Sequence, residues 1–99
     1  MIPKFKHIRS KAIRNAANGE ACTICGQNDG TTVFCHLDEQ WAGKGMRQKA
    51  DDIAGFFGCY ICHVAYEKKP NFHYDWEITR AYYRTIRRLF EKGIIKLAE

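Results

Sequence analysis

Four of the five cysteines of this chain occur in two pairs, each with two residues between the partners. The pairs are Cys22 with Cys25 and Cys59 with Cys62. A Cys-x-x-Cys turn lets two thiolates reach one metal ion, and two such turns supply the four sulfur ligands that tetrahedral zinc prefers. The sequence therefore predicts a structural Zn²⁺ ion held by these four residues. The alternatives are a thioredoxin-like redox pair, which would need a βαβ setting that is absent, and four ordinary buried thiols, which rarely pair so regularly.

Two histidines and an acidic pair form a second group with chemical potential. His36 ends a β-branched and aromatic run, and His63 directly follows Cys62, so on a helix it points about 100° away from that cysteine. If the strand packs beside the helix, both imidazoles face one pocket. Asp51 and Asp52 lie between them in the sequence and offer oxygen ligands, so the set predicts a single-metal hydrolytic site. The alternative is that His36 is a packed strand histidine and His63 a fifth candidate zinc ligand.

The elements that must position these residues are short. Helix caps and residue propensities predict, in chain order, a helix over 11–17, strands over 31–37 and 56–58, a helix over 60–66, and a longer helix that stops at Gly93. Ser10 and Asp75 are the expected N-caps, and Gly19 is the expected end of the first helix. Residues 38–52 lack an apolar period and predict an irregular loop, with a short helix over 46–50 as an option. The apolar stripe of the last helix is expected to consist of Ile78, Tyr82, Ile86 and Leu89.

Composition bounds the fold and the class of partner. The chain has 99 residues with 16 Lys plus Arg against 11 Asp plus Glu, which gives a net charge of +5. This length excludes a multidomain enzyme and predicts one small α+β domain over 1–99: a basic N-terminal helix or arm over 1–19, a zinc-stapled core over 20–69 and a C-terminal helix over 70–99. No secretory signal or membrane-spanning run is visible, so we expect a soluble, cytoplasmic protein with no membrane partner.

The positive charge suits a polyanion such as DNA, although basic residues that merely solvate helices would give the same balance. The candidate nucleic-acid-binding residues are Lys44, Arg47, Arg80, Arg84, Arg87 and Arg88. The first two flank a glycine-rich stretch whose backbone amides could approach a phosphate, and the other four lie on the predicted last helix.

Several short motifs together resemble a known family of nucleases. They are Cys22-Thr23-Ile24-Cys25, Cys35-His36-Leu37, Gly43-Lys44-Gly45, Asp52 and Cys59-Tyr60-Ile61-Cys62-His63. In this arrangement the chain resembles the HNH, or ββα-metal, endonucleases, in the subset stapled by two Cys-x-x-Cys knuckles. Within that class it is similar to the YbcO family of prophage-encoded nucleases and their phage relatives, over about residues 8–95.

The resemblance implies a ββα-metal fold and metal-dependent hydrolysis of DNA phosphodiester bonds in phage or prophage DNA metabolism, inside the bacterial host cytoplasm. It makes His36 the general base, and His63 and Asp52 candidate ligands of a catalytic divalent metal. Asp52 stands where the family often has Asn, and Cys35 stands where an Asp or His ligand is common. The resemblance implies Mg²⁺, Mn²⁺ or another transition ion as the hydrolytic metal, and the soft thiol of Cys35 is poorly matched to Mg²⁺ and favours a transition ion.

Two further functions are compatible with the same residues. One is a non-catalytic zinc-containing DNA-binding or accessory protein of phage recombination or replication, and the other is a structural zinc domain that binds another protein. The sequence is also compatible with a homodimer. A monomer with one site would nick a single strand, whereas a dimer with two sites would make a double-strand break.

Overall fold

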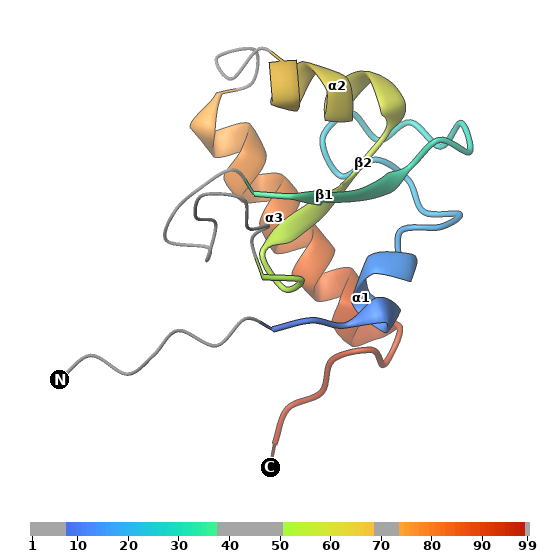
Figure 1. Ribbon diagram of the computed structural model, residues 1–99, viewed down its shortest axis with the longest axis vertical. Coiled ribbons are helices and arrows are strands. Elements are labelled where there is room, and N and C mark those ends of the chain that lie inside the picture. The colour runs from blue at the N-terminus through green and yellow to red at the C-terminus, as the bar shows by residue number, and fades with distance from the viewer. Residues whose placement is uncertain (1–7, 38–50, 69–73, 99) are drawn as a thin grey trace, which may run out of the picture.

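The structure is a computed structural model that describes residues 8–37, 51–68 and 74–98. In this part of the chain the elements are α1 (Lys11–Asn15), β1 (Val33–His36), β2 (Gly55–Gly58), α2 (Tyr60–Lys68) and α3 (Asp75–Glu91). The two strands form an antiparallel pair, with α2 above them, α1 below them and α3 behind them (Figure 1). The predicted small α+β domain is confirmed. None of the described helices is long and apolar enough to cross a membrane.

The two faces of the strand pair bury different clusters. Cys35 pairs with Phe56 and Phe34 with Phe57 in the register, and because neighbouring residues on a strand alternate, the two pairs point to opposite faces. Phe56 packs edge-on against Tyr66 of α2, with ring centroids 5.3 Å apart. Phe57 belongs to the second cluster, whose other buried members are Ile13, Ala16, Ala17 and Leu89. The sheet therefore separates an α2 side from an α1 side.

The Ser10 cap and the Gly93 stop are confirmed. The Ser10 hydroxyl accepts a hydrogen bond from the Ile13 N–H at 3.2 Å, and Gly93 takes a φ of +74° directly after the cap residue of α3. The first helix is shorter than predicted: it ends at Asn15 with Ala16 as its cap, and Gly19 takes its φ of +79° in the turn that follows. Asp75 was the expected N-cap of α3, and this was wrong by one residue. The cap is Tyr74, whose backbone N–H donates to the Glu77 carboxylate at 3.0 Å. Asp75 instead lies in the first turn, where its charge complements the helix dipole.

The buried line of α3 also differs from the expected apolar stripe. Ala81, Thr85 and Leu89 are fully buried. The other expected members, Ile78, Tyr82 and Ile86, are only partly buried. Small side chains at 81 and 85 let α3 approach β2 closely.

The C-terminal end of α3 is tied to the segment that follows α1. Arg88 forms an ion pair with Glu20, and Lys92 Nζ donates to the carbonyl of Ala16 at 2.8 Å. These contacts join residues that are 68 and 76 positions apart in the sequence, and they hold the end of α3 against the α1 side of the domain.

Thr85 offers a first prediction about stability. Its hydroxyl accepts a hydrogen bond from the Phe57 N–H at 3.0 Å in the core. Thr85→Val keeps the shape but leaves that N–H without an acceptor, so we expect the free energy of unfolding to fall by about 1–3 kcal/mol. Thr85→Ser keeps the hydroxyl and should lose less. Urea unfolding of the zinc-loaded proteins measures both, and a valine variant as stable as wild type would contradict the role of this bond.

Candidate functional site

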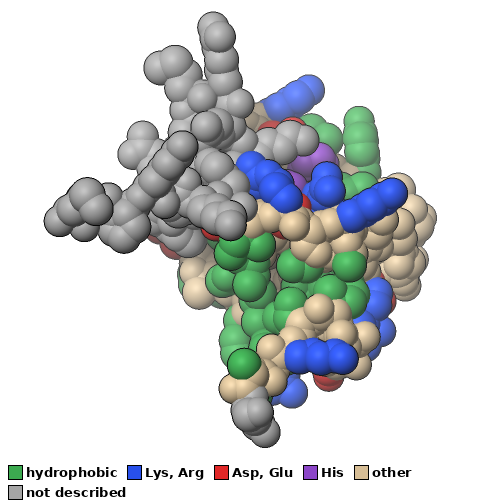
Figure 2. Space-filling view, turned by 60° about the horizontal axis from the view of Figure 1, so that its bottom comes forward, with side chains coloured by type: hydrophobic (Ala, Val, Ile, Leu, Met, Phe, Trp, Pro, Cys, Tyr) green, Lys and Arg blue, Asp and Glu red, His purple; other side chains and the backbone are tan. Residues whose placement is uncertain are grey.

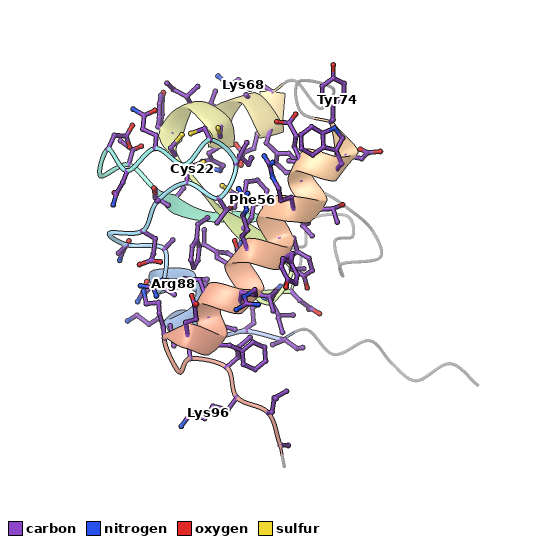
Figure 3. All side chains as sticks on the ribbon, turned by 180° about the vertical axis from the view of Figure 1, so that it is seen from behind. Cys22, Phe56, Lys68, Tyr74, Arg88 and Lys96 are labelled. Atoms are coloured by element: carbon purple, nitrogen blue, oxygen red, sulfur yellow. The ribbon has the colours of Figure 1, made fainter. Side chains whose placement is uncertain are left out.

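The four knuckle cysteines meet at one point beneath α2 (Figure 3). Their sulfur atoms all lie within 4.8 Å of one another, and Cys25 Sγ is 3.7 Å from Cys59 Sγ. A zinc–sulfur bond of about 2.3 Å places the sulfurs of a tetrahedron about 3.8 Å apart. The donor set and its spacing therefore fit zinc, and the predicted grouping of Cys22, Cys25, Cys59 and Cys62 is confirmed.

Local backbone geometry brings the two knuckles together. Gly26 takes a φ of +81°, and its N–H donates to the Cys22 carbonyl at 2.9 Å, which closes the first turn. The Thr23 N–H donates to the Phe57 carbonyl at 2.8 Å and so docks this turn on β2. Cys59 follows β2 directly and Cys62 lies in the first turn of α2. The strand pair thus spans the long gap between the two cysteine motifs.

The electrostatics of this quartet also favour a bound cation. Burial raises the pKa of the Cys22 thiol, but backbone N–H groups, first that of Cys25, outweigh it and bring this pKa to about 7. Burial and the neighbouring sulfurs raise the pKa of Cys25 and Cys62. One thiolate forms readily and the next ones are opposed by its charge, so a divalent ion relieves the repulsion among four thiolates.

A histidine–carboxylate pair lies on the other side of the sheet. His36 Nε2 is 2.8 Å from Asp52 Oδ1, and the Asp52 side chain is only 2% exposed. The other oxygen, Oδ2, accepts from the Ser10 N–H at 2.6 Å and lies 3.3 Å from Arg14 Nε. Burial raises the pKa of Asp52, but the hydrogen bonds from His36 and Ser10 and the charge of Arg14 lower it below its usual value. Asp52 is therefore ionised at neutral pH.

The ionised carboxylate fixes the tautomer of His36. Because Asp52 can only accept, Nε2 of a neutral His36 must carry the proton, which leaves the lone pair on Nδ1. The Phe34 ring packs against the imidazole in a T-shaped arrangement, with ring centroids 5.2 Å apart. Gly55 lies opposite His36 in the strand register. The His36 side chain keeps 20% of its surface exposed. A ring held in this way keeps Nδ1 as its proton acceptor.

His63 has a different carboxylate partner. Its Nε2 lies 2.9 Å from Glu67 Oε1, one turn later on α2. α2 packs on the face of Cys35, while His36 packs with Phe34 on the other face, and the common pocket expected for both imidazoles stays a prediction. Within residues 8–37, 51–68 and 74–98, the cysteine quartet is the group of three or more His, Cys, Asp or Glu able to hold one ion. The roles of His36, Asp52 and His63 stay predictions.

Four of the six predicted DNA-binding residues lie on α3. Lys44 and Arg47 lie outside the described residues, as do the predicted short helix over 46–50 and most of the predicted loop. On α3, Arg84 donates to the Thr23 carbonyl, Arg87 donates to the Tyr83 hydroxyl, Arg88 pairs with Glu20, and Arg80 lies over the Trp76 ring at 4.9 Å. Contact of these arginines with DNA stays a prediction.

Two arginines near His36 were not among the predicted site residues. Arg9 and Arg14 both approach Asp52, at 3.9 and 3.3 Å. The sequence feature that could have pointed to these two arginines is the N-terminal stretch, in which the charged residues up to Arg14 are all basic.

Asp52→Asn tests the buried pair. The change leaves the Arg14 guanidinium and the Ser10 N–H without their anionic partner, so we expect the free energy of unfolding at pH 7 to fall by about 3 kcal/mol. Since the pKa of Asp52 is lower in the folded protein, its contribution is present above the ordinary value of 3.8 and is lost as pH falls through the folded value. The difference from wild type should therefore persist at pH 5 and shrink below pH 4 in urea titrations. Asp51→Asn, at the adjacent carboxylate, is the matched control with a smaller expected loss.

Comparison with known proteins agrees with this architecture. The family model described as "Putative nuclease YbcO" matches residues 11–94. A solved structure described as that of a putative bacteriophage protein from Escherichia coli strain K-12 substrain MG1655 is similar in fold, with a TM-score of 0.58 and 21% identity. The match covers 83% of this chain and 100% of that one. A search of curated proteins finds no match. The chain therefore belongs to the YbcO family.

Proposed function

We propose that this protein is an HNH-type endonuclease that hydrolyses DNA phosphodiester bonds with His36 as its general base. The observation that carries the proposal is the 2.8 Å pair between His36 Nε2 and the buried Asp52 carboxylate. This pair assigns the proton to Nε2 and leaves Nδ1 as the acceptor, which a general base requires. Membership of a nuclease family supports the choice of a phosphodiester as substrate.

The protein groups supply the proton transfer. His36 Nδ1 takes a proton from water, the water oxygen attacks phosphorus, and the bond from phosphorus to the leaving oxygen breaks, with a solvent proton neutralising that oxygen. The imidazolium that forms is stabilised by the charge of Asp52, in the manner of a base oriented by a carboxylate. Asp52 acts here as a positioning residue, because it touches His36 and not the substrate.

Two metals have different parts in this proposal. The quartet of cysteines would give a bound Zn²⁺ ion four protein ligands and no open position, so that zinc would have a structural part. A separate divalent ion, when bound, would stabilise charge on the phosphate, and Asp52 and His63 stay its predicted ligands. Each oxygen of Asp52 already accepts one hydrogen bond, Oδ1 from His36 and Oδ2 from Ser10, so a metal ion would have to use a remaining lone pair.

Cleavage of supercoiled plasmid by the zinc-loaded protein tests the proposal. The reactions contain Mg²⁺, Mn²⁺, Ni²⁺ or no added divalent metal. We expect metal-dependent conversion to the nicked form. Intact plasmid under every condition, from folded protein with one zinc per chain, would contradict the proposal. Retardation of the uncut plasmid in a gel would then favour the zinc-containing DNA-binding protein.

A further inference from the structure

Two arginines, Arg9 just before α1 and Arg14 within it, lie close to the Asp52 carboxylate that is hydrogen-bonded to His36. Arg14 Nε is 3.3 Å from Asp52 Oδ2, and Arg9 Nη1 is 3.9 Å from Asp52 Oδ1. The carboxylate is 2% exposed, whereas the Arg14 and Arg9 side chains are 49% and 43% exposed. The acid therefore lies at the bottom of the cluster and the two guanidinium groups reach the surface.

The charge of this region is not balanced at the surface. Residues 8–14 and 51–52 are paired through the Asp52 N–H to Ile8 carbonyl bond at 2.9 Å and the Ile8 N–H to Asp51 carboxylate bond at 3.0 Å. Together these two stretches carry three cations, Arg9, Lys11 and Arg14, against two acids. Since Asp52 is buried and all three cations are exposed, these two described stretches together present a net positive charge at the surface. Figure 2 shows several Lys and Arg side chains, in blue, close together on one face of the molecule.

A single carboxylate links the base to the cation. Asp52 Oδ1 bonds His36 while Oδ2 contacts Arg14, so the same buried group orients the imidazole and one edge of the guanidinium. Arg14 makes these contacts through Nε, and a guanidinium contacted there can present its two terminal nitrogens to a phosphate in a planar, two-bonded arrangement.

We propose that Arg14, assisted by Arg9, binds a backbone phosphate of DNA beside His36. The identification of that phosphate as the one that is cleaved rests on the proposed function, whereas the binding itself does not. The alternative is that Arg14 only braces Asp52 and the start of α1, where its Nε also lies 3.4 Å from the Ser10 carbonyl. A brace contributes to stability but not to DNA affinity.

Fluorescence anisotropy with a labelled 20-base-pair duplex separates these roles. The titrations use the full zinc-loaded chain without added divalent metal, at KCl concentrations from 50 to 200 mM. At the lowest salt we expect Arg14→Gln to bind DNA about tenfold more weakly than wild type. The slope of the logarithm of the binding constant against the logarithm of the KCl concentration should fall in magnitude by about 0.9, which corresponds to the loss of one phosphate contact. Arg14→Lys keeps the charge and should recover most of the affinity. Lys68→Gln, on α2 at the other side of the domain, removes one charge as a control and should change affinity less than twofold.

Thermal melting and zinc content are measured for every variant. If Arg14→Gln binds DNA as tightly as Lys68→Gln does while its melting temperature falls, Arg14 is only a brace and the inference is overturned. If Arg14→Gln does not fold, Arg9→Gln decides, because Arg9 makes the longer contact with Asp52: a loss of about threefold supports the inference, and a loss below twofold overturns it.

The plasmid assay distinguishes this inference from the proposed function. Binding that depends on Arg14, in a protein that cuts no DNA, would support the phosphate site and contradict the nuclease. If cleavage depends on His36 but the affinity for DNA is unchanged in the Arg14 and Arg9 variants, the result would support the nuclease and contradict the phosphate site.

Discussion

Stripping the metal from the cysteine quartet is expected to unfold the whole domain. Cys22, Cys59 and Cys62 are buried in the same cluster as Phe56 and Ala81, so the metal site and the core are continuous. Structural zinc supplies an apparent binding free energy of about 10–16 kcal/mol, which matches or exceeds the stability of about 5–15 kcal/mol that a domain usually has. A strong chelator should therefore abolish the helical circular dichroism as zinc is released, with both signals following one transition.

The fifth cysteine provides the matched control for this prediction. Cys35 is 1% exposed and lies outside the quartet, and burial raises the pKa of its thiol to about 12. Cys35→Ala should keep one zinc per chain and fold, whereas Cys59→Ser should lose both the metal and the fold. A chelated protein with native circular dichroism, or zinc loss in Cys35→Ala, would show that this quartet does not hold the domain together.

His36→Ala is expected to reduce the rate of DNA cleavage by about 10²- to 10⁴-fold, the usual contribution of a general base. Zinc content should not change, because His36 is no ligand of the quartet. The unfolding transition should shift to lower stability, because the buried Asp52 carboxylate loses its hydrogen bond from His36, so cleavage is measured under conditions where the variant is folded. Single-turnover cleavage of plasmid, at the metal concentration that is optimal for wild type, measures the effect. Added imidazole should restore part of the lost rate, which a variant damaged only in its structure would not show.

His63→Ala is the informative comparison for the second histidine. If His63 binds the catalytic ion, its loss should shift the metal concentration needed for half-maximal cleavage, and added imidazole should not act as a base in its place. Cleavage by His36→Ala at the wild-type rate would show that His36 has no part in the mechanism.

The parts of the fold that follow from local rules could be predicted from the sequence. The two cysteine motifs, the Ser10 cap and the Gly93 stop each depend on residues only a few positions apart. The quartet was predictable as well, because four thiols at these spacings have few other uses in a small domain.

The surroundings of His36 depend on contacts that sequence spacing does not determine. Asp52 meets His36 across 16 positions and Ser10 across 42, and no periodicity links these residues. Strand alternation does predict that Cys35 and His36 point to opposite faces, but the face that α2 covers is set by packing. The buried line of α3 was equally hidden, since Thr85 is buried for its hydrogen bond to Phe57 and not for hydrophobicity.

The ties between the end of α3 and the start of the domain constrain how the protein is made. Cys62 completes the metal ligands well before Thr85, Arg88 and Lys92 leave the ribosome, yet these three residues supply the partners of Phe57, Glu20 and Ala16. At about 5–20 residues per second, translation from Cys62 to Lys92 lasts about 2–6 seconds. During that interval the nascent chain can already hold zinc while the α1 side of its sheet still lacks its cover. Zinc supply and protection of this face are therefore needed at different moments of synthesis.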